Sequence, residues 1–506
     1  MFKSAGWNWF SQLYIAIAGI AVIPVYIKYF GAEVYGLIAF MLTLQMLMSL
    51  LDVGFSASLS REASRYRAGA SELRFFHSFL AIILRVFLCS GIVLAFSIFF
   101  AASFLATQWL EVNELDLNLV TYLLQISALT IFCRWLATFF RSVLFGYEDI
   151  IWLAKFTTVV ATLRFLLVVP LIVYWQIDVE FYFYYQFFVQ LFELLVLVGR
   201  KHKLLPVAKE TVTMSLFDEA FKAPVKFTLA AGGATILWLL ISQADKFFAS
   251  TFLSLADYGY FHVAVMAAGL ITLITAPLVQ AMQPRVTTFL ATGDLDSALN
   301  IVRQLFDFMT VMSVSTVLVV YIFGFSLLRA WYGESGFAER TYQVFLIYSA
   351  ATAVLAINSC SYILDYAAGK IRLRNYFSLA MLLLLLVAYP LSFYYFSSVG
   401  AAFVWLGINV LYFIVAQPLL LSQHSSALYP NLVQRTILPR ILLCICLAAA
   451  CFVLDLPAVF QLIESRIGLF VMAGFSWIIL IVIFLLAKAE PRAFLLNKLS
   501  DYYERT

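Results

Sequence analysis

The sequence predicts an all-α integral membrane protein with about 14 transmembrane helices. Of its 506 residues, 64% are hydrophobic and only 12% are charged. A soluble protein of this length needs more charge to cover its surface, so lipid must solvate much of the chain. Apolar stretches of roughly 20 residues, the length that crosses a bilayer, recur from one end to the other. The basic residues fall between these stretches in an alternating pattern that supports the same conclusion.

The fourteen expected spans follow one another with short connections. No cleavable signal fits the first ten residues, so the first stretch is expected to remain as a helix. The connections at 147–151 and 397–400 are so short that neighbouring spans could be joined, and a count of twelve or thirteen stays open. The spans are expected at 8–29, 35–57, 78–104, 119–144, 152–174, 181–199, 227–252, 259–283, 304–328, 341–367, 376–396, 400–421, 440–457 and 467–487.

The distribution of Lys and Arg predicts the orientation. With the N-terminus inside, 23 of the 32 basic residues fall in inner loops or tails, Arg440 among them, and only four fall outside. This asymmetry follows the positive-inside rule and places both termini in the cytoplasm. The longest hydrophilic inner segment, 200–224, separates two halves. The expected organisation is a six-helix bundle at 1–199, a cytoplasmic linker at 200–226, a second bundle at 227–421, and two further helices with a tail at 422–506.

An internal repeat links the two halves. The segment 29–36 reads YFGAEVYG before the second span, and 252–259 reads FLSLADYG before the eighth. Tyr35 and Tyr258 lie 223 residues apart, and Arg61 and Arg285 beyond the same spans lie 224 apart. An offset of six spans makes the halves parallel repeats. Two such bundles around a central cavity are typical of a transporter.

These motifs resemble the polysaccharide export branch of the MOP superfamily, whose best-known members are the O-antigen (Wzx-type) flippases. The resemblance is carried by GAEVYG at 31–36, Asp52-Val-Gly54, Asp245-Lys246, the DYG at 257–259, and Pro284-Arg285 with Gly293-Asp294. It extends over about residues 5–490. The motifs are degenerate, and the last two spans show less similarity.

The resemblance implies a function, a location and partners. It implies a flippase of the bacterial inner membrane that moves an undecaprenyl-diphosphate-linked oligosaccharide, such as an O-antigen unit, from the cytoplasmic to the periplasmic leaflet. The work of such a protein belongs to polysaccharide and lipopolysaccharide biosynthesis, beside a polysaccharide polymerase. It implies no cofactor. The identity of the sugar does not follow from the resemblance.

Five basic residues are left over from the count of the two sides and lie within the expected spans, away from their ends or close to the inner face: Arg85, Arg134, Arg141, Arg164 and Lys246. A charge at the bilayer centre costs about 2.5–3.5 kcal/mol on insertion scales, so such residues usually face a cavity or a partner. Because guanidinium groups bind phosphate oxygens bidentately, these residues are candidates to bind an anionic substrate. The alternative is structural pairing, for example with Glu193 or Asp52.

Embedded acids are candidates for coupling to a proton or sodium-ion gradient. They are Asp52, Glu193, Asp245, Asp307 and Asp365. Most lie near span ends, so solvation or structural pairing is the alternative for each. Asp245 and Lys246 are adjacent, so their side chains are expected to point about 100° apart and not to face each other. Prolines at 24, 170, 277, 390 and 418 can kink spans, although membrane helices also carry proline without a function.

Other classes of function fit less well. An oligosaccharide polymerase or a polyprenyl-linked glycosyltransferase needs catalytic residues in large outer loops or a soluble domain, and neither is present in the sequence. A multidrug cation antiporter of the same superfamily should line its cavity with acids, whereas this chain embeds arginines. The dispersed basic residues argue against nucleic-acid binding. The six cysteines lie in apolar stretches without CxxC spacing and are interpreted as small core residues.

Overall fold

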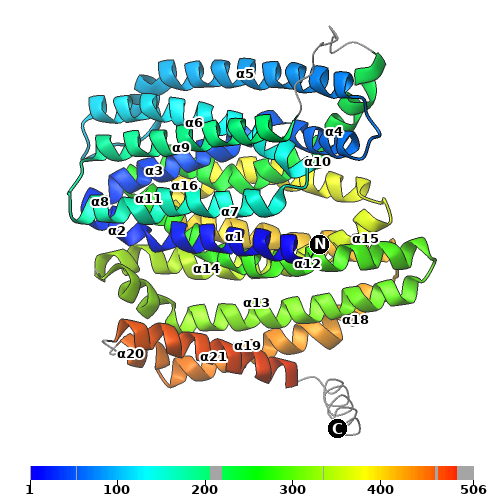
Figure 1. Ribbon diagram of the computed structural model, residues 1–506. Helices are drawn as coiled ribbons and strands as arrows, with labels where there is room; N and C mark the ends of the chain where they lie inside the picture. Colours follow the sequence, from blue (N-terminus) through cyan, green and yellow to red (C-terminus); the bar gives the residue numbers. More distant parts are fainter. Residues whose placement is uncertain (1, 53, 206–218, 334, 462–464, 487–506) are drawn as a thin grey trace, which may run out of the picture. The chain divides into compact units, whose positions relative to one another are not determined.

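The structure of the protein is a computed structural model that describes residues 2–52, 54–205, 219–333, 335–461 and 465–486 (Figure 1). Within these ranges the regular secondary structure is helical, and the only β contact is an isolated bridge between Glu111 and Ser254. In the part of the chain that the structure describes, twelve helical segments are long and apolar enough to cross a membrane. The all-α membrane fold predicted from the sequence is therefore confirmed.

The chain divides into two compact units, Met1–His262 and Val263–Thr506. The first unit contains α1 to α10 and the start of α11. Its helices are α1 (Phe2–Ala21), α2 (Ile23–Phe30), α3 (Ala32–Met48), α4 (Phe55–Arg67), α5 (Leu73–Phe104), α6 (Leu117–Gly146), α7 (Ile150–Ala161), α8 (Val168–Val173), α9 (Val179–Leu204), α10 (Glu219–Phe252) and α11 (Leu255–Ala268).

The second unit contains α12 to α21, again in chain order. Its helices are α12 (Leu270–Ala291), α13 (Leu295–Tyr332), α14 (Ser335–Ser359), α15 (Tyr362–Ala367), α16 (Arg372–Leu411), α17 (Gln417–Ser422), α18 (Leu428–Leu432), α19 (Leu438–Val453), α20 (Leu456–Gln461) and α21 (Arg466–Leu486). The predicted linker falls partly on 206–218, outside the described residues. The predicted division into bundles at 200–226 and 421 stays a prediction.

The predicted spans and the observed helices agree closely. Each of the fourteen spans overlaps helix, and the seventh lies within α10. The eleventh and twelfth spans fall in one segment, Arg372–Ser422. Ser397 interrupts the helix there with φ 54° and ψ −147°, so the backbone does break at the short connection expected from the sequence. The separation of α1 from α2 falls just before Pro24, where a proline ends helical hydrogen bonding.

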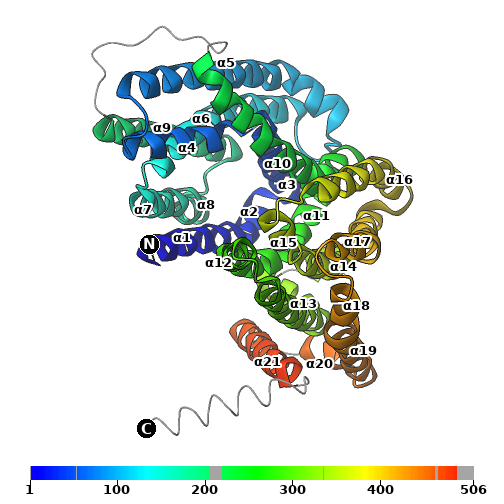
Figure 2. The same cartoon turned by 90° about the vertical axis from the view of Figure 1, so that its right-hand side faces the viewer.

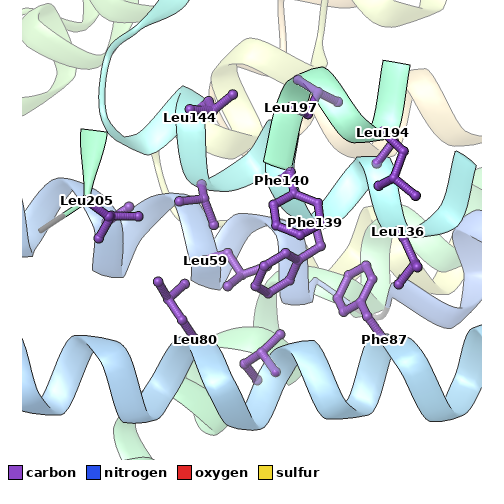
Figure 3. Packing of buried hydrophobic residues seen from close by; sticks show 14 of the residues in the cluster. Leu59, Leu80, Phe87, Leu136, Phe139, Phe140, Leu144, Leu194, Leu197 and Leu205 are labelled. Carbon is purple, nitrogen blue, oxygen red and sulfur yellow. The ribbon is translucent and has the colours of Figure 1, made fainter. Parts of the chain in front are cut away.

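The core of the first unit lies where α5, α6 and α9 run side by side with α4 (Figures 1 and 3). Phe87 of α5 stacks on Trp135 of α6 with ring centroids 4.6 Å apart. The Trp135 indole N–H donates to the Phe87 carbonyl at 2.9 Å, which satisfies a polar group inside the core. A side chain at Gly91 would collide with the same indole, so glycine permits this close approach of the two helices.

In the second unit the C-terminal helices α19, α20 and α21 pack on α13 (Figure 2). Asp307 of α13 forms an ion pair with Arg440 of α19, and the Arg440 side chain is almost fully buried. Arg440 lies in the first turn of α19, which begins two residues earlier, and its side chain is buried rather than exposed in a loop. Its predicted position on the inner side stays a prediction. Asp307 therefore has a structural ion-pair partner, which is the alternative to a role in coupling.

The repeat motifs lie at two helix starts that contact each other within the first unit. α3 begins at Ala32 and α11 at Leu255. A Cβ on Gly36 would overlap the Leu255 carbonyl oxygen, and a Cβ on Gly259 would lie 3.1 Å from the Ala32 carbonyl. The Tyr258 hydroxyl is 2.7 Å from the Thr43 hydroxyl. Glycine in both motifs thus lets two helix backbones approach closely.

Glu33 in the first motif anchors a loop. Its carboxylate accepts backbone N–H groups from Asn113, Glu114 and Leu115 at 2.7–2.9 Å, and the residue is 2% exposed. Three N–H donors satisfy a buried carboxylate without a cation. The motif therefore serves the fold at this end of the first unit.

The six cysteines are all free. Cys133 and Cys360 are buried as expected, whereas Cys89 and Cys446 are exposed on membrane helices, so the interpretation as core residues does not hold for these two.

Candidate functional site

Four of the predicted site residues meet inside the first unit. Arg134 and Arg141 come from α6, Arg164 from the segment between α7 and α8, and Glu193 from α9. Glu193 is 2% exposed, and its carboxylate forms ion pairs with both Arg141 and Arg164. The Arg164 Nη2 atom lies 3.3 Å from Glu193 Oε2 and donates to Gln190 Oε1 at 2.6 Å. We call these four residues, with Gln190, the arginine cluster.

Arg134 occupies a different position in the cluster. It is partly buried near the middle of α6, and its electrostatic neighbours are Arg164, Glu193 and Arg141. Its guanidinium forms no ion pair or hydrogen bond within the described residues. Arg134 and Arg141 are seven residues apart on α6, about two helical turns, and both lie towards the same carboxylate. Glu193 was also a candidate structural partner for the arginines, and that pairing is present for two of the three.

A local break in helical regularity presents Arg164. The residue lies in the π-helical segment Thr162–Leu167. Wider helical turns leave carbonyls without their usual donors, and here side chains of α9 supply them: the Tyr185 hydroxyl donates to the Leu163 carbonyl at 2.6 Å, and Gln186 Nε2 to the Arg164 carbonyl at 3.2 Å. Single π-turns are frequent at functional sites. The sequence analysis had no signal for this irregularity.

The arginine cluster carries more positive than negative charge and more donors than acceptors. Three guanidinium groups surround one carboxylate. Arg164 Nε and Gln190 Nε2 are buried and have no hydrogen-bond partner among the described residues. Buried donors without acceptors are costly, so the cluster is suited to take up an additional anionic, oxygen-rich group.

A polar cavity of about 790 Å³ adjoins the arginine cluster through Arg141. Its walls come from α1, α4, α6 and α7. Most of the described residues that line it are polar or basic, and none of them is acidic. The polar and basic lining residues are Asn8, Ser11, Gln12, Ser56, Ser60, Arg61, Ser64, Thr138, Arg141, Ser142 and Thr157.

Arg61 was not predicted as a site residue, because the pattern of apolar spans places it in a loop. Arg61 lies on α4 and lines the cavity while also contacting Glu62 at 3.8 Å. The repeat had drawn attention to its position. The small polar residues at the start of α1 were missed because Ser, Asn and Gln at single positions carry no spacing signal.

Two predicted basic residues lie elsewhere. Arg85 is exposed on α5, away from the arginine cluster's hydrogen bonds. Lys246 Nζ lies 2.9 Å from Asp245 Oδ1 and 3.0 Å from the Ser242 carbonyl. The expectation that Asp245 and Lys246 do not face each other is wrong, because the flexible lysine chain folds back towards its neighbour.

The remaining acids are held by local partners. Asp52 accepts the backbone N–H of Ser56 at 2.9 Å. Asp365 is buried in the second unit, where Arg374 lies 2.7 Å and His424 3.1 Å from its carboxylate. Among the described residues no group of three His, Cys, Asp or Glu side chains is placed to hold a metal ion. Of the coupling candidates, only Glu193 lies in the arginine cluster.

Several solved structures share this arrangement of helices. The lipid II flippase MurJ, in an inward closed conformation, matches 94% of this chain and 97% of its own, with a TM-score of 0.67 and 13% identity. An inward-facing multidrug resistance MATE family transporter of the MOP superfamily matches 83% and 96%, with a TM-score of 0.60 and 17% identity. The Vibrio cholerae MATE transporter VcmN in its bent form matches 85% and 97%, with a TM-score of 0.53 and 15% identity. At these identities the likeness shows the fold, which is that of a MOP-type transporter.

The family is shown by the sequence of the first half. Residues 1–289 match the family described as polysaccharide biosynthesis protein, and this covers more than half of the chain. The chain therefore belongs to that family. No curated protein matches it.

Proposed function

We propose that this protein is a flippase for an undecaprenyl-diphosphate-linked oligosaccharide, an O-antigen or related polysaccharide unit, moved from the cytoplasmic to the periplasmic leaflet. The observation that carries the proposal is the arginine cluster: three guanidinium groups, one carboxylate and unpartnered donors beside a polar cavity. A diphosphate presents the oxygens that such donors bind. The family and the flippase fold of MurJ support a lipid-linked substrate.

The proposed path uses alternating access. The two predicted six-helix bundles, 1–199 and 227–421, move around a central cavity, and both termini face the cytoplasm of a bacterial inner membrane. The diphosphate enters beside Arg61 and Arg141, passes Arg134 and Arg164, and leaves on the other side. The lipid tail stays in the bilayer, where the apolar surfaces of α19 and α21 offer contact. Arg85 and Lys246 remain candidates for contacts along this path.

Energy coupling and partners belong to the same proposal. Glu193 is the strongest candidate for coupling to a proton or sodium gradient, because protonating it would release Arg141 and Arg164 towards the substrate. Asp52, Asp245, Asp307 and Asp365 have local partners that favour structural roles. A polysaccharide polymerase would receive the flipped unit, and this protein itself performs no covalent chemistry.

A multidrug cation antiporter is the second candidate, since MATE transporters share the fold. An organic cation would meet repulsion from the surplus guanidinium charge of the arginine cluster. The charge of the site therefore favours the anionic substrate.

The test is transfer of a labelled undecaprenyl-diphosphate oligosaccharide in inverted membrane vesicles, with a fluorescent organic cation in parallel. We expect native protein to transfer the lipid and the Arg134→Gln variant to lose most of this activity. Arg372→Gln, which removes one exposed positive charge at the start of α16 outside the proposed path, is the matched control. Transfer of the cation and not of the lipid would refute the proposal. Equal lipid transfer by native and Arg134→Gln protein would retain a flippase but reject the site.

A further inference from the structure

A second cavity lies in the second unit, separate from the arginine cluster. Its volume is about 420 Å³, and it is enclosed by the end of α12, the start of α13, the end of α15 and the turn after α17. The residues that line it are Thr287, Leu290, Ala291, Leu295, Ala367, Ala368, Lys370, Gln423 and His424. None of these described residues is acidic. Nothing in the proposed transport path uses this cavity.

The polar part of the cavity consists mainly of donors. Lys370 Nζ donates one of its three N–H groups to the Gln423 carbonyl at 3.1 Å, and its side chain is otherwise exposed. The Gln423 Nε2 atom is buried and has no hydrogen-bond partner among the described residues. A buried amide group with two unpaired N–H donors costs free energy unless an acceptor reaches it. The Gln423 amide N–H groups thus lack an acceptor among the described residues.

The Asp365 carboxylate, which accepts from the cavity residue His424, does not supply that acceptor. Asp365 is 1% exposed, and its oxygens are taken by Arg374 at 2.7 Å and by His424 Nε2 at 3.1 Å. Arg374 also donates to the Ser361 hydroxyl at 2.6 Å. Asp365 is therefore paired with Arg374 and His424, and Lys370 is the basic side chain among the described residues that line the cavity.

The surroundings of the cavity are those of a membrane interface. Tyr362, Tyr366 and Ile371 are exposed large side chains beside it, and exposed Arg372 lies over the ring of Tyr376 at 5.7 Å. Exposed tyrosines and basic residues are enriched at the level of lipid headgroups. The cavity wall itself combines the Lys370 and Gln423 donors with leucine and alanine side chains. This combination suits an amphiphile with an anionic head.

We propose that this cavity binds the phosphate group of an anionic phospholipid from the adjacent leaflet. Lys370 supplies the charge, Gln423 Nε2 donates to a phosphate oxygen, and Leu290 and Leu295 contact the glycerol and the first carbons of the acyl chains. Basic pockets between transmembrane helices bind anionic headgroups in this manner. The proposal concerns a bound lipid rather than the transported substrate, so it does not depend on the proposed function.

The test uses the full-length protein in detergent, with phosphatidylglycerol and phosphatidylcholine titrated separately and bound lipid counted by native mass spectrometry. We expect phosphatidylglycerol to bind preferentially. Lys370→Gln should weaken it about fivefold, which corresponds to ~1 kcal/mol for one basic residue near a headgroup. Gln423→Leu should also weaken it. Arg372→Gln removes the same charge two residues further along, at the start of α16 and outside the cavity lining, and it should leave binding unchanged.

Inorganic phosphate distinguishes the two sources of the anion. If phosphate at millimolar concentration stabilises native protein but not Lys370→Gln, and phosphatidylglycerol shows no preference, the site takes soluble phosphate and the lipid assignment is overturned. If neither ligand depends on Lys370 while Arg372→Gln behaves identically, no phosphate site exists there. Should Lys370→Gln fail to fold, Gln423→Leu and Lys370→Arg decide: the first should lose the lipid and the second should retain it.

Discussion

Replacing Arg134 tests whether this arginine binds the substrate or stabilises the fold. Arg134 lies near the middle of α6 with no ion pair among the described residues, whereas Arg164 is paired with Glu193. An arginine at the centre of a membrane helix costs about 2.5–3.5 kcal/mol on insertion scales. Arg134→Met should therefore leave the free energy of unfolding unchanged or raise it, up to that amount. The attraction of Glu193 and the partial exposure of Arg134 will reduce the gain.

Transport should respond in the opposite direction. A hydrogen bond to a charged group contributes about 1.5–3 kcal/mol, so loss of the Arg134 contact should lower transfer of the lipid-linked diphosphate roughly 10- to 150-fold below saturation. Arg164→Met is the comparison, because it leaves the Glu193 carboxylate with one partner fewer and should destabilise the fold by about 3–5 kcal/mol at most.

The assay measures both quantities on the same preparations: thermal or denaturant unfolding in detergent, and lipid transfer after reconstitution. The reasoning is refuted if Arg134→Met unfolds as readily as Arg164→Met, or if it transfers lipid as well as native protein does. Either result would make Arg134 part of the scaffold.

Further predictions follow from single contacts. Glu193→Gln leaves Arg141 and Arg164 without a counter-charge and should lower the free energy of unfolding by about 3–5 kcal/mol. If the variant unfolds at the same denaturant concentration as the native protein, the ion pairs contribute nothing to stability. Asp307→Asn should loosen α19 from α13, seen as faster proteolysis after α18, and unchanged cleavage would contradict a role for the ion pair. Asp294 caps α13 by accepting the Ser297 backbone N–H at 3.0 Å. Its hydrogen bonds with the Ser297 side chain and backbone N–H lower the pKa of Asp294, so the carboxylate is charged at neutral pH. Asp294→Ala should lower the melting temperature, whereas Asp294→Asn, which keeps a capping oxygen, should lose less; an equal loss in both variants would contradict the capping hydrogen bond as the cause.

The comparison of Arg85 with Arg134 shows what the sequence could and could not predict about the site. Both are arginines inside long apolar stretches, and the cost of burial applies equally to both. In the structure one is exposed on α5 and the other faces Glu193. Membrane helices are apolar around most of their circumference, so the sequence pattern does not reveal which face meets a neighbouring helix.

The sequence by itself determined the all-α membrane fold, the approximate positions of the spans and the two helix starts that carry the repeat. These properties depend on local composition, because a bilayer requires about 20 apolar residues per span wherever they occur. Only the tertiary structure decided that Glu193 lies between Arg141 and Arg164, that Arg440 reaches Asp307, and that Lys370 and Gln423 share a cavity. Those pairings join residues far apart in the chain, and they depend on the rotation and packing of whole helices rather than on any local pattern.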